Sequence, residues 1–432
     1  MNVFEAKIEY QLKKLHLSPE KNNESFDSEE GAFFMNYILI SPYYPGNFQP
    51  FAHRLKDAGV NVLGIGEEPY DQLGSELQDS LTEYYRVNNL EDVDEMKRAV
   101  AFLFYKHGPI DRIESNNEYW LELDAQLREQ FNVYGNKTND LKKVKYKSEM
   151  KKLFKEADVP VVEGRIVRTK KELAKAIDEL GLPVIAKPDN GVGSAATFKL
   201  SSEEDVHHFE KEWGEAQVYF LEPYVEGGVL CTFDGLVDQK GNIVFQTSFT
   251  YNVPTLELVN GQLDLAYVIQ KEMDPKLETY GKAIVKAFGM KERFFHIEFF
   301  KLENGDYVAL EYNNRLAGGY TIDMYNFAYS IDLFAQYASL VTGGEFKESD
   351  AENQFCVGIT QRDAYEYKHD TNAIYERFGD RVKFERRIPD AFAELQGNQF
   401  YAINADSHEE VDDIIRFVHE RKYSEKEIVL CI

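Results

Sequence analysis

The chain has 432 residues, of which 43% are hydrophobic and 14% aromatic, which suits about three domains of ordinary size. Lys and Arg number 49 against 75 Asp and Glu, so the formal net charge is −26. A negative field of this size repels nucleic acid and anionic lipid. The composition therefore argues against nucleic acid or membrane partners, and a polyanionic ligand would need local cations or a bound metal ion.

The cysteine content and the lengths of the apolar runs further limit the class of protein. Cys231, Cys356 and Cys431 are few, widely spaced and odd in number, which indicates neither a disulfide framework nor a cysteine zinc site. No run is apolar and long enough to cross a membrane, and the N-terminus lacks the pattern of a signal peptide. We therefore expect a cytoplasmic protein.

The first 130 residues predict an extension and a parallel α/β lobe. Phe4, Ile8, Leu12 and Leu15 have the spacing of one helical face, and residues 1–34 are interpreted as an N-terminal extension. Residues 35–130 alternate strand and helix patterns, which predicts a Rossmann-like lobe without a phosphate-binding motif of its own. The expected strands are 37–40, 60–65 and 110–113, and the expected helices are 51–58, 93–107 and 118–131.

The rest of the chain divides into a central region and a tail. The centre mixes helices with antiparallel strands, and we place a small lobe at 131–225 and a large lobe at 226–346. Thr169 and Glu172 form a capping-box pattern that predicts a helix ending at Gly181. Residues 347–432 predict a C-terminal α+β subdomain of ferredoxin-like order. Its expected elements are strands 355–360, 382–386, 399–404 and 428–431, a helix between the first two strands and a second helix at 409–420.

The most informative stretch is residues 296–315, where two alternating apolar runs flank Asn304-Gly305. Asn-Gly between such runs predicts a two-residue hairpin turn of type I′, which has positive φ at both positions. The register set by that turn places two pairs of residues directly opposite each other on one face. These pairs are Glu298 with Glu311, and His296 with Asn313.

Two opposed carboxylates predict a cation between them, because they would otherwise repel each other and destabilise the hairpin. Oxygen ligands favour Mg²⁺, Mn²⁺ or Ca²⁺ over Zn²⁺, and Mg²⁺ commonly adds waters and substrate phosphates. We predict a magnesium or manganese site with Glu298, Glu311 and Asn313 as protein ligands, and Arg315 on the same face. The alternative is a solvated face with two ordinary surface glutamates.

A second group of signals concerns phosphate binding. Residues 183–188 form a short apolar strand that contains Lys187, and a turn with Gly191, Gly193 and Ser194 follows directly. The backbone N–H groups of such a turn can surround phosphate oxygens. The alternative is a plain hairpin with a snorkelling lysine.

Two further segments suit a nucleotide. Lys147 begins an expected helix, although a lysine at that place is usually just solvated. Residues 221–228 have the pattern of a strand running into a bend, which can offer backbone groups to an adenine and carboxylates to a ribose. The alternative interpretation of residues 221–228 is an edge strand that ends at glycines.

Taken together, these segments resemble the ATP-grasp superfamily. The resemblance lies in the order of Lys147, Lys187, a glycine-rich loop, an E-P-Y-V-E-G hinge, a glutamate in H-I-E-F and the element E-Y-N-N-R, and it spans residues 134–346. It implies an ATP-grasp fold of mixed α/β and α+β class, with two lobes that clasp ATP. The lobe at 35–130 resembles the Rossmann-like pre-ATP-grasp domain that usually precedes this fold.

The resemblance implies a role for each matched position. Lys147 and Lys187 would contact the ATP phosphates, and Arg315 would steady the γ-phosphate or acyl phosphate, so Lys187 and Arg315 are the expected catalytic groups. The remaining nucleotide contacts would be a lid of Gly191, Gly193 and Ser194 and an adenine hinge of Glu222, Tyr224, Val225 and Glu226. The metal ligands would be Glu298, Glu311 and Asn313, for two Mg²⁺ or Mn²⁺ ions.

One position departs from the family pattern. Many members place a ribose-binding glutamate two residues after the hinge glycine, where this sequence has Val229. Glu226 or another group would then have to contact the ribose.

The stretch from Leu316 to Tyr320 resembles the R-x-x-G-G element of carboxylate–amine and L-amino acid ligases, and Asp234-Gly235 resembles the same branch. This implies a ligase that forms an acyl phosphate and ADP, after which an amine displaces phosphate. The substrates would be a small carboxylate and an amine, amino acids among them. Residues 114–118 follow a strand where such a lobe can contact the acyl substrate, and a solvated loop is the alternative.

Two alternative functions and the oligomeric state stay open at this stage. The first alternative is an ATP-grasp phosphotransferase or carboxylase-type enzyme. The second is a non-catalytic nucleotide-binding module that regulates a partner. The sequence also does not decide whether the chain forms a homo-oligomer.

Overall fold

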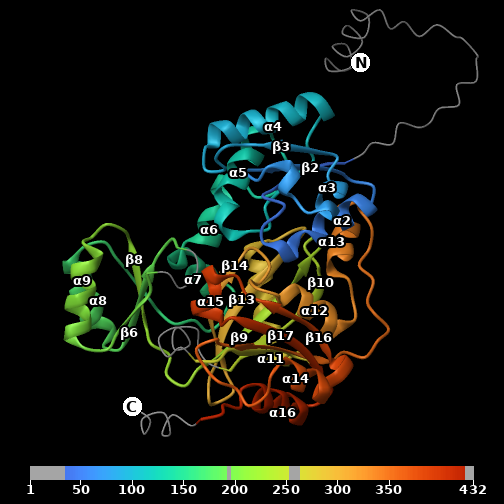
Figure 1. The fold of residues 1–432 in the computed structure, drawn as a ribbon. Coiled ribbons are helices and arrows are strands. Elements are labelled where there is room, and N and C mark those ends of the chain that lie inside the picture. Colours follow the sequence, from blue (N-terminus) through green and yellow to red (C-terminus); the bar gives the residue numbers. More distant parts are fainter. Residues whose placement is uncertain (1–34, 192–195, 253–262, 424–432) are drawn as a thin grey trace, which may run out of the picture. The chain divides into compact units, whose positions relative to one another are not determined.

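The computed structural model describes residues 35–191, 196–252 and 263–423, and all of them belong to one unit that begins at Met35. The helix expected before residue 18, the strand expected at 428–431, Gly193 and Ser194 lie outside the described residues. Three sheets organise the part of the chain that is described (Figure 1).

The first sheet is parallel, has the strand order β3-β2-β1-β4 and confirms the predicted Rossmann-like lobe. Its strands are β1 (Asn36–Ile40), β2 (Asn61–Gly66), β3 (Glu83–Arg86) and β4 (Arg112–Glu114). Its helices are α2 (Pro50–Asp57), α3 (Ser75–Ser80), α4 (Val93–His107) and α5 (Leu121–Gln130), with short 3-10 segments η1 (Gly46–Phe48), η2 (Tyr70–Gln72) and η3 (Glu118–Trp120). The sequence predictions missed β3 and α3, because both are short and β3 has no buried apolar run.

Local sequence explains the clearest helix of this lobe. The Asp92 side chain accepts hydrogen bonds from the N–H groups of Asp94 and Glu95, which satisfies free donors at the start of α4. The buried side of α4 is apolar and consists of Met96, Ala99, Val100 and Leu103. The helix therefore begins and ends where the periodicity predicts.

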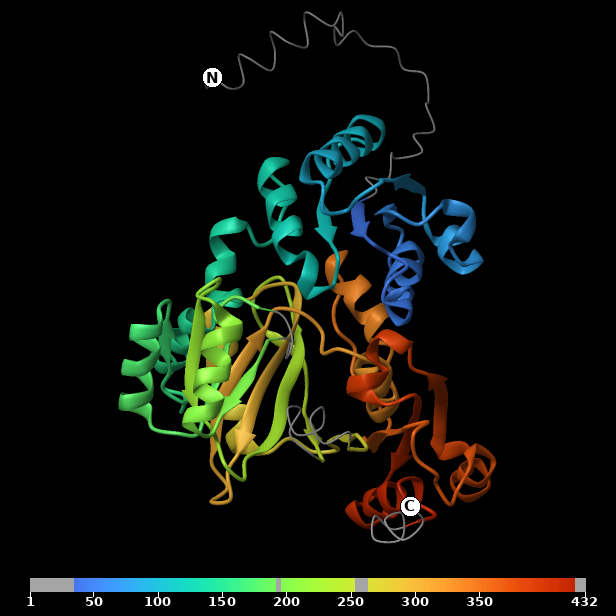
Figure 2. The same cartoon turned by 60° about the vertical axis from the view of Figure 1, so that its left-hand side comes forward.

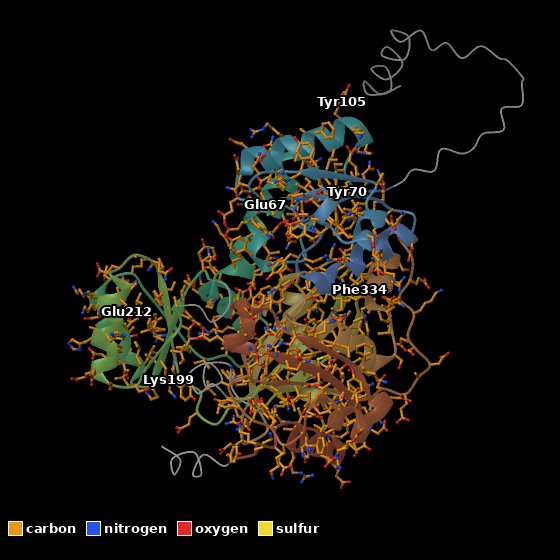
Figure 3. The ribbon with its side chains drawn as sticks, viewed as in Figure 1. Glu67, Tyr70, Tyr105, Lys199, Glu212 and Phe334 are labelled. Atoms are coloured by element: carbon orange, nitrogen blue, oxygen red, sulfur yellow. The ribbon has the colours of Figure 1, made fainter. Side chains whose placement is uncertain are left out.

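The second sheet is antiparallel, with the order β5-β8-β6-β7. It consists of β5 (Arg165–Val167), β6 (Val184–Pro188), β7 (Phe198–Leu200) and β8 (Tyr219–Pro223), and helices α8 (Lys170–Leu180) and α9 (Glu203–Trp213) cover one of its faces. Lys199 and Glu212 mark this lobe in Figure 3. It is joined to the first sheet through η4 (Thr138–Leu141), α6 (Lys142–Lys145) and α7 (Lys147–Glu156).

The capping box predicted for α8 is half formed. The Thr169 hydroxyl oxygen accepts from the N–H of Glu172, and the helix ends before Gly181 with φ of 74°, as predicted. The Glu172 carboxylate instead accepts from the N–H of Arg168, one residue before the expected donor. The helix start is therefore correct although the reciprocal bond is shifted.

The third sheet has nine strands in the order β14-β13-β9-β11-β12-β15-β17-β16, with β10 paired to β9. Its strands are β9 (Val229–Val237), β10 (Ile243–Thr247), β11 (Phe249–Tyr251), β12 (Ala266–Ile269), β13 (Arg293–Lys301), β14 (Tyr307–Asn313), β15 (Phe355–Gln361), β16 (Val382–Arg387) and β17 (Gln399–Ala405). The associated helices are α11 (Pro275–Phe288), α12 (Thr321–Tyr329), α13 (Leu333–Val341), α14 (Thr371–Phe378), α15 (Asp390–Gln396) and α16 (His408–Val418), with η5 (Gly379–Arg381).

The C-terminal strands, red in Figure 2, extend this third sheet. β15 pairs with β12 on one side and β17 on the other, so the strands expected for a separate subdomain continue the sheet of the large lobe. The domain boundaries given above stay predictions.

The first lobe packs on the large lobe through aromatic side chains. Phe51 of α2 and Phe334 of α13 have ring centroids 4.8 Å apart, and Figure 3 labels Phe334. The hydroxyl groups of Tyr37 and Tyr337 are 2.8 Å apart in the same core. None of the helices within the described ranges is both long and apolar enough to cross a membrane.

Candidate active site

One face of the third sheet carries two rows of polar side chains across β9, β13 and β14. The opposite face packs apolar side chains such as Phe295, Ile297 and Phe299 against α7 and α11. The first row is Asp234, His296 and Asn313, and the second row is Thr232, Glu298 and Glu311. The predicted oppositions of Glu298 with Glu311 and of His296 with Asn313 are confirmed.

The turn of the hairpin differs from the prediction. Gly305 has φ of +78°, whereas Asn304 does not have positive φ, so a type I′ turn is wrong. The N–H of Gly305 donates to the carbonyl of Leu302, and the Asn304 side chain accepts from the N–H of Asp306. This is a three-residue connection with glycine in the left-handed position, which shifts the register by one residue.

A β-bulge compensates for that shift. Glu298 pairs with Glu311, but the next pair is Phe299 with Ala309, so Leu310 is an extra residue in β14. The bulge also reverses the alternation of β14 and turns Glu311 away from the apolar core. The two glutamates therefore oppose each other because two departures from the regular hairpin cancel.

Lys147 lies against one of these carboxylates. It begins α7, which packs on β14, and its buried ammonium is 3.0 Å from Glu311 Oε1. The same Nζ donates to the carbonyl of Gly191, at a distance of 3.3 Å. The structure therefore places Lys147 between the predicted metal carboxylate and the start of the predicted lid.

Lys187 and Lys151 share the carboxylate of Glu222. Both ammonium groups pair with Glu222, and all three side chains are buried. Burial alone would raise the pKa of Glu222, but Lys151 and Lys187 lower it to about 2. Burial disfavours the charged form of Lys187, yet Glu222, Glu311 and Glu298 raise its pKa, so Lys187 lies within electrostatic reach of both predicted metal carboxylates.

Sequence reasoning missed Lys151. It follows Lys147 by four residues, which puts the two lysines on one side of a helix, and that spacing was the available signal. Its Nζ also donates to the carbonyl of Ala309 in β14, at 3.3 Å. Lys151 thus ties α7 to both β8 and β14.

His296 connects the two rows of polar side chains. Its Nδ1 is 2.7 Å from Asp234 Oδ1, and its Nε2 is 3.2 Å from Glu298 Oε1. Burial alone would lower the pKa of His296, but Asp234 and Glu298 raise it to about 9. Burial would raise the pKa of Glu298, and His296, Arg315 and Lys187 lower it.

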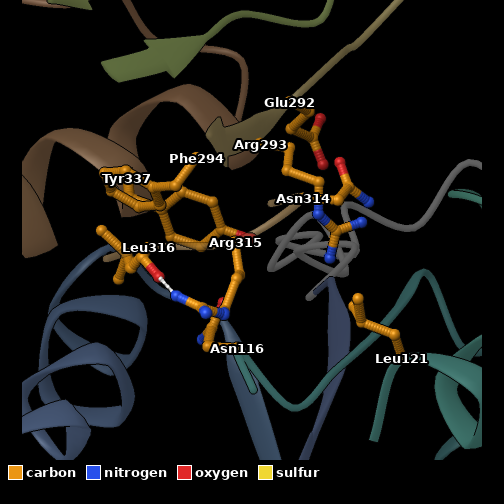
Figure 4. Close-up of a pocket in the computed structure, with 9 residues that line it drawn as sticks. All are labelled: Asn116, Leu121, Glu292, Arg293, Phe294, Asn314, Arg315, Leu316 and Tyr337. Atoms are coloured by element: carbon orange, nitrogen blue, oxygen red, sulfur yellow. Dashed lines mark hydrogen bonds between the residues drawn. The ribbon is translucent and has the colours of Figure 1, made fainter. Parts of the chain in front are cut away.

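Arg315 meets the loop that follows β4. Its Nε donates to Glu118 Oε2 at 2.8 Å, and its Nη1 donates to the carbonyl of Leu316 at 2.6 Å. Figure 4 shows the guanidinium beside Asn116 of the same loop. Glu114 is placed differently, because it is buried in ion pairs with Arg128 and Arg293. The predicted substrate loop therefore reaches Arg315 through Glu118.

The hinge residues Tyr224, Val225 and Glu226 are less buried than Glu222. Tyr224 and Val225 are half-buried, Glu226 is exposed, and Val229 is 43% exposed. The ammonium of Lys199 lies 3.6 Å from the ring centroid of Tyr224. Glu222 is the hinge side chain that the structure brings to the lysines.

The donor set fits a divalent cation that shares its ligands with a nucleotide. No group of three or more His, Cys, Asp or Glu side chains in the described ranges is arranged to hold a metal ion. Glu298 and Glu311 provide two carboxylates, and Asn313 lies in the neighbouring row. Such an oxygen set suits Mg²⁺ when phosphates supply further ligands. Lys147 is 3.0 Å from Glu311, and Lys187 lies within electrostatic reach of both carboxylates.

Comparison with known proteins agrees with this geometry. The profile of a family described as an ATP-grasp domain matches residues 180–323. An L-arginine-specific L-amino acid ligase of Bacillus subtilis is 25% identical over 311 residues, which covers 69% of this chain and 73% of that protein.

Solved structures show the same fold. An L-amino acid ligase from Bacillus licheniformis superposes with a TM-score of 0.68 at 14% identity, covering 88% of this chain and 96% of that one. The biotin carboxylase domain of 2-oxoglutarate carboxylase from Hydrogenobacter thermophilus, solved with MgADP and bicarbonate, has a TM-score of 0.67 at 17% identity and covers 90% of this chain and 91% of that one.

Proposed function

Because the chain belongs to the ATP-grasp superfamily, we propose that it is a cytoplasmic, ATP- and Mg²⁺-dependent ligase that joins a carboxylate to an amine. The carboxylate is activated as an acyl phosphate with release of ADP, and the amine then displaces phosphate. The observation that carries the proposal is that Glu298 and Glu311 oppose each other on one face of the third sheet, with Lys147 3.0 Å from Glu311 and Lys187 within electrostatic reach of both.

The proposed roles follow from charge. Lys147 and Lys187 bind the ATP phosphates, and Glu298, Glu311 and Asn313 hold one or two Mg²⁺ ions. Bound Mg²⁺ neutralises phosphate charge and so lowers the repulsion between the triphosphate and a substrate carboxylate. The hinge from Glu222 to Glu226 takes the adenine.

Arg315 would serve the transferred phosphoryl group. It is paired with Glu118 in the structure, so an incoming anion has to share its guanidinium with that carboxylate or displace it. Fixed positive groups aimed at the developing charge stabilise the transition state without reorganisation. The loop at 114–118 is therefore proposed to contact the acyl substrate.

We propose amino acids as the substrate class, because the ligase relatives of known name act on them. No protein nucleophile is needed, since the substrate carboxylate attacks the γ-phosphate directly. The products are an amide or peptide, ADP and phosphate.

The test is ADP and phosphate release measured over paired carboxylates and amines, followed by the mass of the product. Release that requires both substrates, with a product mass equal to their condensation, would support the ligase. A phosphorylated product formed without an amine would instead indicate a phosphotransferase. Binding of MgATP without turnover across a broad amino acid panel would indicate a regulatory module.

A further inference from the structure

We propose that His296 is a positioning residue that holds the Glu298 carboxylate in its cation-binding orientation, with Asp234 fixing the imidazole from the other side. The inference rests on the proposed function, because it assumes that a divalent cation binds at Glu298. It concerns three side chains linked one to the next, Asp234 to His296 to Glu298.

The geometry leaves the imidazole no free nitrogen. Carboxylates only accept hydrogen bonds when ionised, so His296 donates from Nδ1 to Asp234 and from Nε2 to Glu298, at 2.7 and 3.2 Å. The side chain is 4% exposed, and its ring is stacked on Phe249, with 8° between the planes. Rotation of the ring would break both hydrogen bonds and the stacking contact.

Asp234 is itself held in place. Its second oxygen, Oδ2, accepts from the hydroxyl groups of Thr232 and Tyr325, at 2.5 and 2.8 Å. Three donors therefore fix one buried carboxylate, and that carboxylate fixes His296. A fully satisfied buried network of this kind is rigid, and it transmits that rigidity to the side chain at its end.

Glu311 is held by a different kind of contact from the one that holds Glu298. Its partner is Lys147, which is also the proposed phosphate ligand, so bound ATP competes with Glu311 for that ammonium. His296 has no such competing role, because both of its nitrogens bond within the sheet. Glu298 is therefore oriented in the free and the nucleotide-bound protein, whereas Glu311 is released for the cation when phosphate arrives.

The first experiment measures Mn²⁺ affinity by the electron paramagnetic resonance of free Mn²⁺, in the presence of a saturating non-hydrolysable ATP analogue. His296→Gln should weaken Mn²⁺ binding by about 10-fold or more, the usual effect of losing a partner behind a metal ligand. Calorimetry in EDTA should find unchanged affinity for the analogue. The matched control is His419→Gln, which removes a half-buried histidine bonded to the carbonyl of Thr360 in β15.

Turnover separates positioning from a purely structural role. If His296 acts through Glu298, the variant should have a raised KM for Mg²⁺, and excess Mg²⁺ should restore much of its kcat. A loss of kcat that excess Mg²⁺ does not restore would overturn the inference.

A second variant keeps the test decisive if His296→Gln does not fold. Asp234→Asn keeps the shape of the side chain, and it should weaken Mn²⁺ binding in the same direction. The double variant should be little worse than His296→Gln, because both changes act along one chain of hydrogen bonds. Mn²⁺ affinity equal to wild type in the variants would overturn only this inference, whereas no Mn²⁺ binding by the wild type would overturn the proposed function as well.

Discussion

At the scale of single residues, the lysines of the site each lie against a carboxylate. Lys147 pairs with Glu311, and Lys151 and Lys187 pair with Glu222. Buried ion pairs add little net stability compared with apolar packing, but removing one partner leaves an uncompensated charge. We infer that this cluster is kept for ligand binding, and that it makes single substitutions costly.

Glu311→Gln should lower kcat/KM for ATP by at least about 100-fold, because it removes one of the two opposed carboxylates proposed to hold Mg²⁺. ADP release over a range of ATP concentrations, with the carboxylate and the amine saturating, is the measurement. Glu303→Gln, on the exposed turn of the same hairpin, is the control and should keep wild-type activity. Near-wild-type activity of Glu311→Gln would contradict the metal assignment.

Glu222→Gln should lower the free energy of unfolding at pH 7 by about 3 kcal/mol, because it leaves Lys151 and Lys187 buried without an anion. Urea unfolding followed by the fluorescence of Trp213, in the core of the same lobe, is the measurement. Glu226→Gln, exposed in the same hinge, is the control.

The same carboxylate gives a pH dependence with a defined sign. The pKa of Glu222 is lowered from 4.5 to about 2 in the folded protein, so its ion pairs contribute fully above 4.5 and are lost as the pH falls toward 2. The difference in stability between wild type and Glu222→Gln should therefore shrink across that window. A difference that stays constant from pH 7 to pH 3 would contradict the lowered pKa.

At the scale of elements, the hairpin of β13 and β14 determines where the carboxylates point. Alternation in a strand would place Glu311 on the same face as Tyr307 and Ala309, which are buried in the core. The extra residue Leu310 moves Glu311 to the opposite face. The bulge therefore places Glu311 on the face of Glu298, and bulges are often found beside active sites.

Gly305→Ala should lower the free energy of unfolding by about 1 kcal/mol, because its φ of +78° is unfavourable for a residue with a Cβ. No atom lies within 4 Å of the added Cβ, so the cost comes from the backbone alone. Gly46→Ala has the same free space without positive φ, and it should not destabilise the protein. Thermal unfolding of both variants is the measurement, and equal stability would contradict the assigned turn.

At the scale of the whole molecule, the site is assembled from all three sheets. The second sheet supplies Lys187 and Glu222, the third supplies Glu298 and Glu311, and the loop after β4 of the first supplies Glu118. The first lobe is also tied to the large lobe by the ion pair of Arg112 with Glu292. Ligand binding at this junction should therefore stabilise the molecule as a whole.

ATP with Mg²⁺ at about 100 times its Kd should raise the free energy of unfolding by about 2.7 kcal/mol. ATP with EDTA should give less than half of this, because phosphates would draw Lys147 away from Glu311 and leave it opposed to Glu298. Calorimetric unfolding with and without EDTA is the measurement. Equal stabilisation in both conditions would contradict the shared cation site.

Local patterns in the sequence were sufficient for most elements and for the outline of the site. The start of α4 and the end of α8 at Gly181 depend on residues close together in the chain. The opposition of Glu298 and Glu311 was predicted correctly from the wrong turn type, because the bulge at Leu310 restores the register that the longer turn shifts. The reason is that capping, periodicity and hairpin pairing are short-range interactions. The order of the lysines, hinge and glutamates then pointed to the ATP-grasp fold.

Tertiary structure alone decided the partners of the functional side chains. His296 bonds to Asp234, which lies 62 residues away, and Arg315 bonds to Glu118, which lies 197 residues away. It also decided that the C-terminal strands join the sheet of the large lobe through β12. Such contacts depend on how separately formed elements pack, and no local pattern encodes that packing.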